Sequence, residues 1–228
     1  MANQEIHIYL LPGLGVDYRL FQWIQFPKWV KPHYWSWEAP KKKESLTSYS
    51  ERYLPLIQKN RPTVLLGVSF GGVVAQEIAR MISVEKIILI SSIKHHHELP
   101  WYFFLGKAFP VHHWISGQQI KIIGAKIQRT LGDRGKGAQL FERMLANTPD
   151  AFMPWAIEQL IHWRQTEMSK NLVHYHGTND HVLPSSYLSD FIPVAGGTHA
   201  MIMVEAQQMN QILTKEMENL RLQLGLTA

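Results

Sequence analysis

One serine lies in a context that is typical of a catalytic nucleophile. Ser69 has Gly67 and Gly71 two residues to either side, follows the apolar run Thr63–Leu66 and precedes a segment with helical spacing of apolar residues. A sharp strand-to-helix turn brings two backbones too close for a Cβ, and it strains the central residue and directs its side chain outward. The Phe70 N–H then lies at the start of a helix, where it can stabilise an oxyanion. The pattern predicts a nucleophilic Ser69; the alternative is a glycine-rich turn with an incidental serine.

An acidic and an imidazole side chain follow two later predicted strands. Asp180 lies in the loop just past the strand predicted over Asn171–His176, and His199 follows the strand predicted over Ser189–Val194. Ligands of open α/β sheets bind at the carboxyl ends of the strands, so both side chains should lie beside Ser69. A neutral imidazole takes the proton of a serine hydroxyl, and a carboxylate fixes the tautomer of that imidazole and stabilises its cationic form. The chain order Ser, Asp, His supplies these three roles.

Two neighbouring residues compete for the same roles. Asp190 is a second carboxylate, but it falls within the strand predicted over 189–194, so we prefer Asp180. His181 is adjacent to Asp180 in sequence and is poorly placed to share a hydrogen bond with it across the site. We therefore prefer His199 as the base.

A loop with two glycines follows the first predicted strand, Glu5–Leu11. Gly13 and Gly15 permit a turn whose backbone N–H groups face a pocket, and we select the Leu14 N–H as the second oxyanion donor. The alternative is a dinucleotide-binding fingerprint, but Tyr18 occupies the third glycine position and no acidic ribose partner follows on a later strand.

Strand and helix patterns alternate along most of the chain. Further strands are predicted over His33–Trp37 and Glu85–Ser91, and helices over Leu46–Lys59 and Met201–Leu220. The continuous apolar character of the 85–91 strand is typical of parallel strands that are covered on both faces. The sequence predicts a single α/β domain over residues 1–228: a three-layer sandwich with a mostly parallel, doubly wound sheet.

The alternation stops between residues 93 and 170. This stretch is rich in aromatic residues and shows helical periods with Gly and Pro breaks, but no strand pattern. We expect a helical lid over the carboxyl edge of the sheet, with Trp101, Phe104 and Trp155 as candidates for the substrate pocket. The alternative is that these aromatic residues only attach the insertion to the rest of the domain.

Composition argues against several classes of function. The 228 residues include no Cys, which excludes a disulfide framework, a thiolate metal site and a cysteine nucleophile. The formal net charge is +5, but the basic residues are scattered apart from Lys41–Lys43, so no nucleic-acid partner is predicted. His95–His97 and His112–His113 lack carboxylates at ligand spacing, and we predict neither a metal nor a cofactor. Without a signal sequence or a long apolar run, we predict a cytoplasmic protein with no integral membrane association. Its oligomeric state stays open.

The chain resembles α/β-hydrolase-fold serine hydrolases over nearly its whole length. The segments that carry the resemblance are the nucleophile elbow Gly67–Gly72, the acid loop His176–Pro184 and the histidine loop Gly196–His199. The resemblance implies Ser69 as nucleophile, Asp180 as orienting acid and His199 as general base and acid.

The resemblance also implies an oxyanion hole and a lid. The hole would consist of the Phe70 and Leu14 amides, and the lid would occupy the place of the 93–170 insertion. Pro12 departs from the pattern, because many esterases have His before the first glycine of this loop.

We expect hydrolysis of a carboxylic ester or related acyl bond in a small, apolar substrate through an acyl-enzyme intermediate. The same residues would serve a thioesterase, an amidase, a lactonase or an acyl transferase, because the fold does not choose the leaving group or the acceptor. A different class is a ligand-binding or sensor protein that keeps the hydrolase shape with little turnover. A further alternative is lipolysis at a membrane surface through exposed aromatic residues of 101–104.

Overall fold

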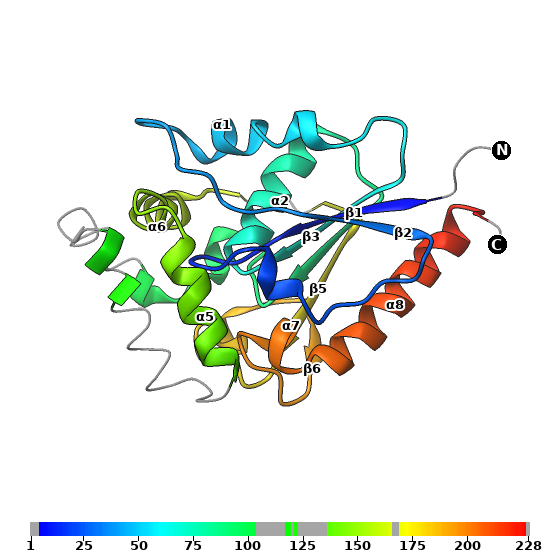
Figure 1. The fold of residues 1–228 in the computed structure, drawn as a ribbon. Helices are drawn as coiled ribbons and strands as arrows, with labels where there is room; N and C mark the ends of the chain where they lie inside the picture. Colours follow the sequence, from blue (N-terminus) through cyan, green and yellow to red (C-terminus); the bar gives the residue numbers. More distant parts are fainter. Residues whose placement is uncertain (1–4, 104–116, 120, 123–135, 166–168, 227–228) are drawn as a thin grey trace.

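A sheet of six parallel strands organises the structure. The computed structural model describes residues 5–103, 117–119, 121–122, 136–165 and 169–226. The strands are β1 (Ile6–Leu11), β2 (Val30–Tyr34), β3 (Thr63–Val68), β4 (Lys86–Ile90), β5 (Leu172–Gly177) and β6 (Ile192–Val194). Their order across the sheet is β2-β1-β3-β4-β5-β6, and every neighbouring pair is parallel (Figure 1). The predicted parallel sheet is confirmed.

The strand order has its switch point between β1 and β3, where the chain connections leave in opposite directions across the sheet. The chain passes from β1 to its outer neighbour β2, and then crosses back to β3 on the other side of β1. Leu11, the last residue of β1, pairs with Gly67 near the end of β3, so the loops that follow these strands begin side by side. Ligands bind at such a switch point in open α/β sheets.

Helices cover both faces of the sheet. The helices that lie wholly within the described residues are α1 (Leu46–Glu51), α2 (Phe70–Met81), α5 (Lys136–Asn147), α6 (Phe152–His162), α7 (Met201–Val204) and α8 (Ala206–Gln223), with 3₁₀ turns at Tyr18–Phe21, Leu54–Leu56, His96–Glu98 and Ser185–Tyr187. In Figure 1, α1 and α2 lie on one face, and α7 and α8 lie on the other. The three-layer sandwich is therefore confirmed.

The buried core has one half on each face of the sheet. Along β1, Ile8 and Leu10 pack in the cluster that contains the buried side chains of α8, whereas Tyr9 and Leu11 pack in the cluster that contains those of α2. Successive strand residues point to opposite faces, so a strand that is covered on both sides must be apolar throughout. Each fully buried aliphatic side chain contributes roughly 2 kcal/mol. The apolar runs of the central strands follow from this arrangement.

Two predicted elements have different bounds in the structure. The strand predicted over 33–37 begins at Val30 and ends at Tyr34. It contains Pro32, which is tolerated because β2 is an edge strand and needs hydrogen bonds on one side only. The helix predicted over 46–59 ends at Glu51 and is followed by a 3₁₀ turn that contains Pro55, which has no N–H to continue a helix.

Two further predictions fail near the C-terminal end of the sheet. The last strand begins at Ile192 rather than at residue 189, because Asp190 has a φ of 45°, which no strand residue adopts. The prediction that Asp190 lies within the strand is therefore wrong, because Asp190 precedes it. The helix predicted over 201–220 is divided at Glu205 (φ −102°, ψ 35°) into α7 and α8.

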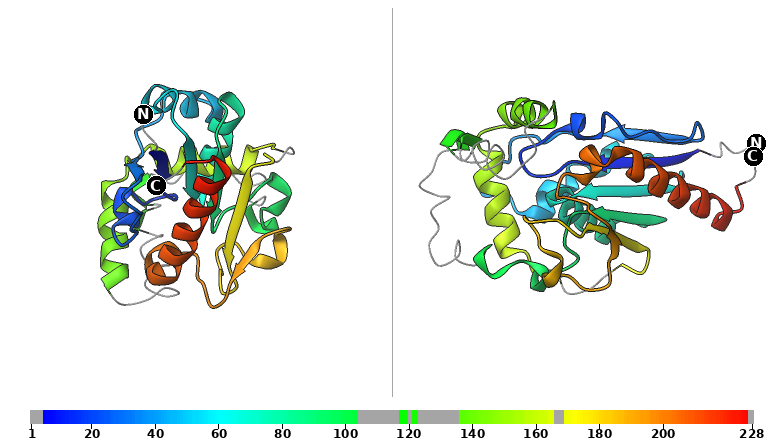
Figure 2. Two further views of the ribbon diagram at one scale, coloured as in Figure 1. Left: turned by 90° about the vertical axis from the view of Figure 1, so that its right-hand side faces the viewer. Right: turned by 90° about the horizontal axis from the view of Figure 1, so that it is seen from below.

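The described part of the 93–170 insertion is helical or irregular and contains no strand. Figures 1 and 2 show α5 and α6 beyond the carboxyl ends of the strands, next to the loops that follow β1 and β3. Among the helices that the structure describes, none is long and apolar enough to cross a membrane.

Candidate active site

Ser69 lies in a strained turn between β3 and α2. Its backbone has a φ of 51° and a ψ of −120°, a conformation that is rare for a residue with a side chain. A Cβ at Gly67 would lie 2.4 Å from backbone atoms of α2, and a Cβ at Gly71 would lie 2.2 Å from the Leu11 carbonyl oxygen. The Ser92 hydroxyl supports the turn by donating to the Ser69 carbonyl oxygen at 2.7 Å. Ser69 thus has a strained backbone, and neither Gly67 nor Gly71 has room for a Cβ.

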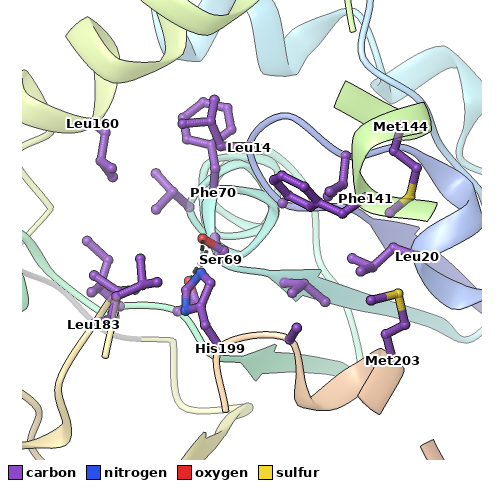
Figure 3. A pocket seen from close by; sticks show the side chains of 18 of the residues that line it. Leu14, Leu20, Ser69, Phe70, Phe141, Met144, Leu160, Leu183, His199 and Met203 are labelled. Atoms are coloured by element: carbon purple, nitrogen blue, oxygen red, sulfur yellow. Dashed lines mark hydrogen bonds between the residues drawn. The ribbon is translucent and has the colours of Figure 1, made fainter. Parts of the chain in front are cut away.

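The structure brings Ser69, His199 and Asp180 into one hydrogen-bonded row. The His199 Nε2 atom lies 3.1 Å from the Ser69 hydroxyl oxygen, and the His199 Nδ1 atom lies 2.7 Å from Asp180 Oδ2. Figure 3 shows the Ser69 and His199 side chains facing one another inside a pocket. With a proton on Nδ1, the imidazole presents a lone pair at Nε2 to the serine hydroxyl. This arrangement can remove a proton from Ser69.

Asp180 is buried and held by several donors. Its Oδ1 atom accepts hydrogen bonds from the backbone N–H groups of Val182, at 2.9 Å, and of Leu183, at 2.8 Å. Burial alone would raise the pKa of the Asp180 carboxyl, but the hydrogen bond and charge of His199, together with the Leu183 N–H, hold that pKa below its usual value. Asp180 is therefore ionised at neutral pH and can stabilise a His199 cation.

Two buried histidines lie behind the acid, and the sequence analysis gave them no role. His176 Nε2 lies 2.8 Å from the Leu183 carbonyl oxygen and 3.3 Å from Asp180 Oδ2, and its Nδ1 lies 3.3 Å from His174 Nε2. Burial lowers the pKa of both rings, and the pKa of His174 falls to about 3. Both rings are therefore neutral. If His174 donates from Nε2 to His176 Nδ1, then His176 carries its own proton at Nε2 and can donate it to the Leu183 carbonyl oxygen. Their i,i+2 spacing on β5 was the available signal, because it places both on one face of the strand.

The two proposed oxyanion donors lie beside Ser69. Phe70 is the first residue of α2, and Leu14 lies in the loop after β1; both line the pocket. A Cβ on Gly13 would lie 3.4 Å from the Ser69 Cβ, so the Gly13–Leu14 peptide borders the nucleophile. Within the described part of the chain, neither the Phe70 N–H nor the Leu14 N–H donates to a protein acceptor. Among the described residues, no protein acceptor would therefore compete with a substrate oxygen for these two N–H groups.

The pocket above Ser69 is apolar. It has a volume of about 400 Å³, and the polar side chains among its described lining residues are Ser69, Ser92 and His199. In Figure 3, Leu160 and Leu183 lie on one side of Ser69, and Leu20, Phe141, Met144 and Met203 lie on the other. The insertion contributes Phe141 and Met144 from α5 and Leu160 from α6.

The predicted pocket aromatics do not line this cavity where they are described. Trp101 is 62% exposed, and its side chain is not among the described lining residues. Trp155 packs instead against Tyr49 and Phe152 and donates from its indole N–H to the Glu44 carbonyl oxygen at 2.7 Å. Phe104 lies outside the described residues. The aromatic residues from the insertion that do line the cavity are Phe103 and Phe141.

The competing residues lie away from the nucleophile. His181 and Asp190 are both exposed, and neither lines the pocket. The described residues contain no group of three or more His, Asp or Glu side chains that could hold a metal ion.

Several solved structures share this architecture. A hydrolase from Pseudomonas aeruginosa superposes with a TM-score of 0.73 at 13% sequence identity, over 93% of this chain and 89% of its own. A structure from a study of carboxylesterases of the thaumarchaeon Nitrososphaera gargenis gives a TM-score of 0.70 at 13% identity, with 96% and 92% covered. A thermophilic esterase from Thermogutta terrifontis gives 0.62 at 13% identity, with 95% and 90% covered.

These similarities are structural. No protein-family model matches the sequence, and no curated protein matches it. At 13% identity the solved structures establish the fold of the chain and not its chemistry. The chain has the α/β-hydrolase fold.

Proposed function

We propose that the protein is a serine hydrolase that cleaves a carboxylic ester or related acyl bond of a small, apolar substrate. Ser69 attacks the acyl carbonyl while His199 takes the hydroxyl proton at Nε2, and the Asp180 carboxylate stabilises the resulting imidazolium. The Phe70 and Leu14 N–H groups hold the oxyanion of the tetrahedral intermediate. His199 then gives the proton to the departing alcohol, which leaves an acyl-enzyme.

Deacylation uses the same groups in reverse. His199 removes a proton from water, and the hydroxide adds to the acyl carbon. The bond between that carbon and Ser69 Oγ then breaks, His199 returns the proton to Ser69, and the carboxylic acid leaves.

One observation carries the proposal. The continuous row from Ser69 Oγ to His199 Nε2, at 3.1 Å, and from His199 Nδ1 to Asp180 Oδ2, at 2.7 Å, ends in an apolar pocket beside two unpaired backbone N–H groups of the described chain. A serine hydroxyl needs a base and an oriented carboxylate to become a nucleophile at neutral pH.

The pocket supports an apolar substrate of limited size. Its described walls are mainly aliphatic and aromatic, and part of them comes from α5 and α6. We propose the 93–170 insertion as a lid that shapes the acyl site and excludes water, within a single domain over residues 1–228. The solved esterases with the same fold support ester bonds as the first class to test.

The direct test is covalent labelling and hydrolysis. The native chain should hydrolyse short p-nitrophenyl acyl esters, and a fluorophosphonate probe should label Ser69. Ser69→Ala should abolish both, whereas Ser185→Ala, in the 3₁₀ turn after the acid loop, should change neither. Comparing ester, thioester, amide and lactone turnover separates the members of this chemical class. Stoichiometric labelling with tight product retention and negligible turnover would instead favour a ligand-binding role.

A further inference from the structure

Trp37 makes a buried hydrogen bond to the loop that carries the Leu14 amide. Its indole N–H donates to the Gly13 carbonyl oxygen at 2.8 Å, across 24 residues of sequence, and the side chain is 6% exposed. The indole N–H is the only polar group of this side chain, and its acceptor belongs to the peptide unit that precedes Leu14.

The geometry of a peptide couples this bond to the proposed oxyanion hole. The described residues contain no cis peptide bond, so the Gly13 C=O and the Leu14 N–H point in opposite directions from one rigid plane. By holding the carbonyl oxygen in the core, Trp37 directs the N–H of the same unit away from the core. The Gly13 position adjoins Ser69, since a Cβ there would lie 3.4 Å from the Ser69 Cβ, and both Gly13 and Leu14 line the pocket.

The indole ring itself is fixed by packing. Its centroid lies 5.0 Å from that of Phe152 in a stacked arrangement, and 5.7 Å from that of Phe70 at an interplanar angle of 65°. Phe70 carries the other proposed oxyanion donor, and Phe152 begins α6. The Trp37 side chain therefore contacts the Gly13–Leu14 loop and Phe70, the two segments that carry the proposed oxyanion donors.

We propose that Trp37 is a positioning residue that aligns the Leu14 N–H for the oxyanion. This inference rests on the proposed function. Without the indole donor, the buried Gly13 carbonyl oxygen keeps only the longer hydrogen bond from the Val16 N–H, at 3.4 Å, and the peptide unit is held less firmly in the alignment that a developing oxyanion requires. The loss should appear in the transition state and not in binding of the neutral ester.

The chain offers a matched control in Trp155. Its indole N–H also donates to a backbone carbonyl, that of Glu44, at 2.7 Å, and its ring also contacts Phe70 and Phe152. Trp155→Phe therefore removes a bond of the same kind from the same aromatic cluster without touching the Gly13–Leu14 peptide.

The test compares Trp37→Phe and Trp155→Phe with the native chain. We expect Trp37→Phe to lower kcat for a p-nitrophenyl ester by about 10- to 100-fold with KM changed by less than about threefold, a part of the effect of losing one oxyanion donor. Affinity for a trifluoromethyl ketone, whose serine adduct places an oxyanion in the hole, should fall by a similar factor. Trp155→Phe should keep both values within about threefold.

A second variant removes the donor and keeps the shape. Incorporation of 3-benzothienylalanine at position 37 replaces the indole N–H by sulfur, and it should reproduce the kcat loss of Trp37→Phe. Native kcat in this variant, equal losses in Trp37→Phe and Trp155→Phe, or a loss in KM alone would each overturn the positioning role. If the native chain reacts with a fluorophosphonate and the Trp37 variants react equally fast, the positioning role alone fails. If Ser69 of the native chain does not react and no ester is hydrolysed, the proposed function fails, and this role fails with it.

Discussion

Replacement of Asp180 by asparagine should inactivate the protein through the tautomer of His199. Asp180 Oδ1 accepts two backbone N–H groups, those of Val182 at 2.9 Å and Leu183 at 2.8 Å, whereas Oδ2 faces His199 Nδ1 at 2.7 Å. The backbone donors require an acceptor, so the carboxamide oxygen of Asp180→Asn must occupy the Oδ1 position. Its NH₂ group then faces His199.

The expected loss of kcat follows from the move of the His199 proton from Nδ1 to Nε2. An NH₂ group donates, so His199 must accept at Nδ1 and carry its own proton at Nε2, the atom that lies 3.1 Å from the Ser69 hydroxyl oxygen. A protonated Nε2 cannot take the serine proton. We expect kcat to fall about 10⁴-fold, which corresponds to roughly 5.5 kcal/mol of lost transition-state stabilisation.

The assay is the kcat of a p-nitrophenyl ester for the native chain, Asp180→Asn and Asp190→Asn. Asp190 is a suitable control because it is exposed, and its φ of 45° is one that asparagine adopts readily. Circular dichroism of each variant checks that it is folded. More than a tenth of the native kcat in Asp180→Asn, or a large loss in Asp190→Asn alone, would refute Asp180 as the orienting acid.

The remaining predictions concern the catalytic unit, the turn and the buried histidines. Ser69→Ala and His199→Ala should each remove nearly all activity, and the double variant should lose no more, because the two side chains act as a unit; additive losses in kcat would contradict this. Gly71→Ala should lower the free energy of unfolding by about 3 kcal/mol in urea titrations, since its Cβ would lie 2.2 Å from a carbonyl oxygen of β1. Gly196→Ala should cost only about 1 kcal/mol, because Gly196 has a φ of +73° but no atom within 4 Å of a Cβ. Burial lowers the pKa of His174 to about 3, so the folded chain keeps this ring neutral while the unfolded chain binds a proton below about pH 6.5, and stability is lost as pH falls through this window. His174→Gln should reduce the loss of unfolding free energy between pH 7 and pH 5 by about 2 kcal/mol; an unchanged loss would contradict neutral burial.

The sheet was predictable because its central strands are buried on both faces. Continuous apolar runs such as Ile87–Ile90 leave few alternatives to a covered parallel strand, and the glycines on either side of Ser69 identify one strand-to-helix turn. The edges were less predictable, because their residues are only partly buried. The strand predicted over 33–37 was displaced to Val30–Tyr34, where an edge position tolerates Pro32.

The site was predictable as far as loop positions determine it. Ser69, Asp180 and His199 each follow a strand, and the parallel sheet brings those strand ends together. The pocket was not predictable in the same way, because lining depends on the direction of each side chain. Trp101 and Trp155 were chosen for their size, yet the first is exposed and the second packs against the aromatic cluster of α1 and α6.

The three parts of the proposed machinery depend on different kinds of contact, and their variants should therefore fail in different ways. Backbone contacts around the glycines hold the Ser69 turn, so a Cβ there should reduce stability before it changes chemistry. Asp180 is fixed by hydrogen bonds to two backbone N–H groups and to His199, so an isosteric change should alter kcat with little loss of stability. The shorter of the two hydrogen bonds that orient the Gly13–Leu14 peptide, at 2.8 Å, comes from the indole N–H of Trp37, 24 residues away from the carbonyl it binds, and no local pattern in the sequence indicates this contact. A Trp37 variant should consequently be folded and able to bind substrate, but it should stabilise the transition state poorly and have a low kcat. This combination separates it from variants of the other two parts.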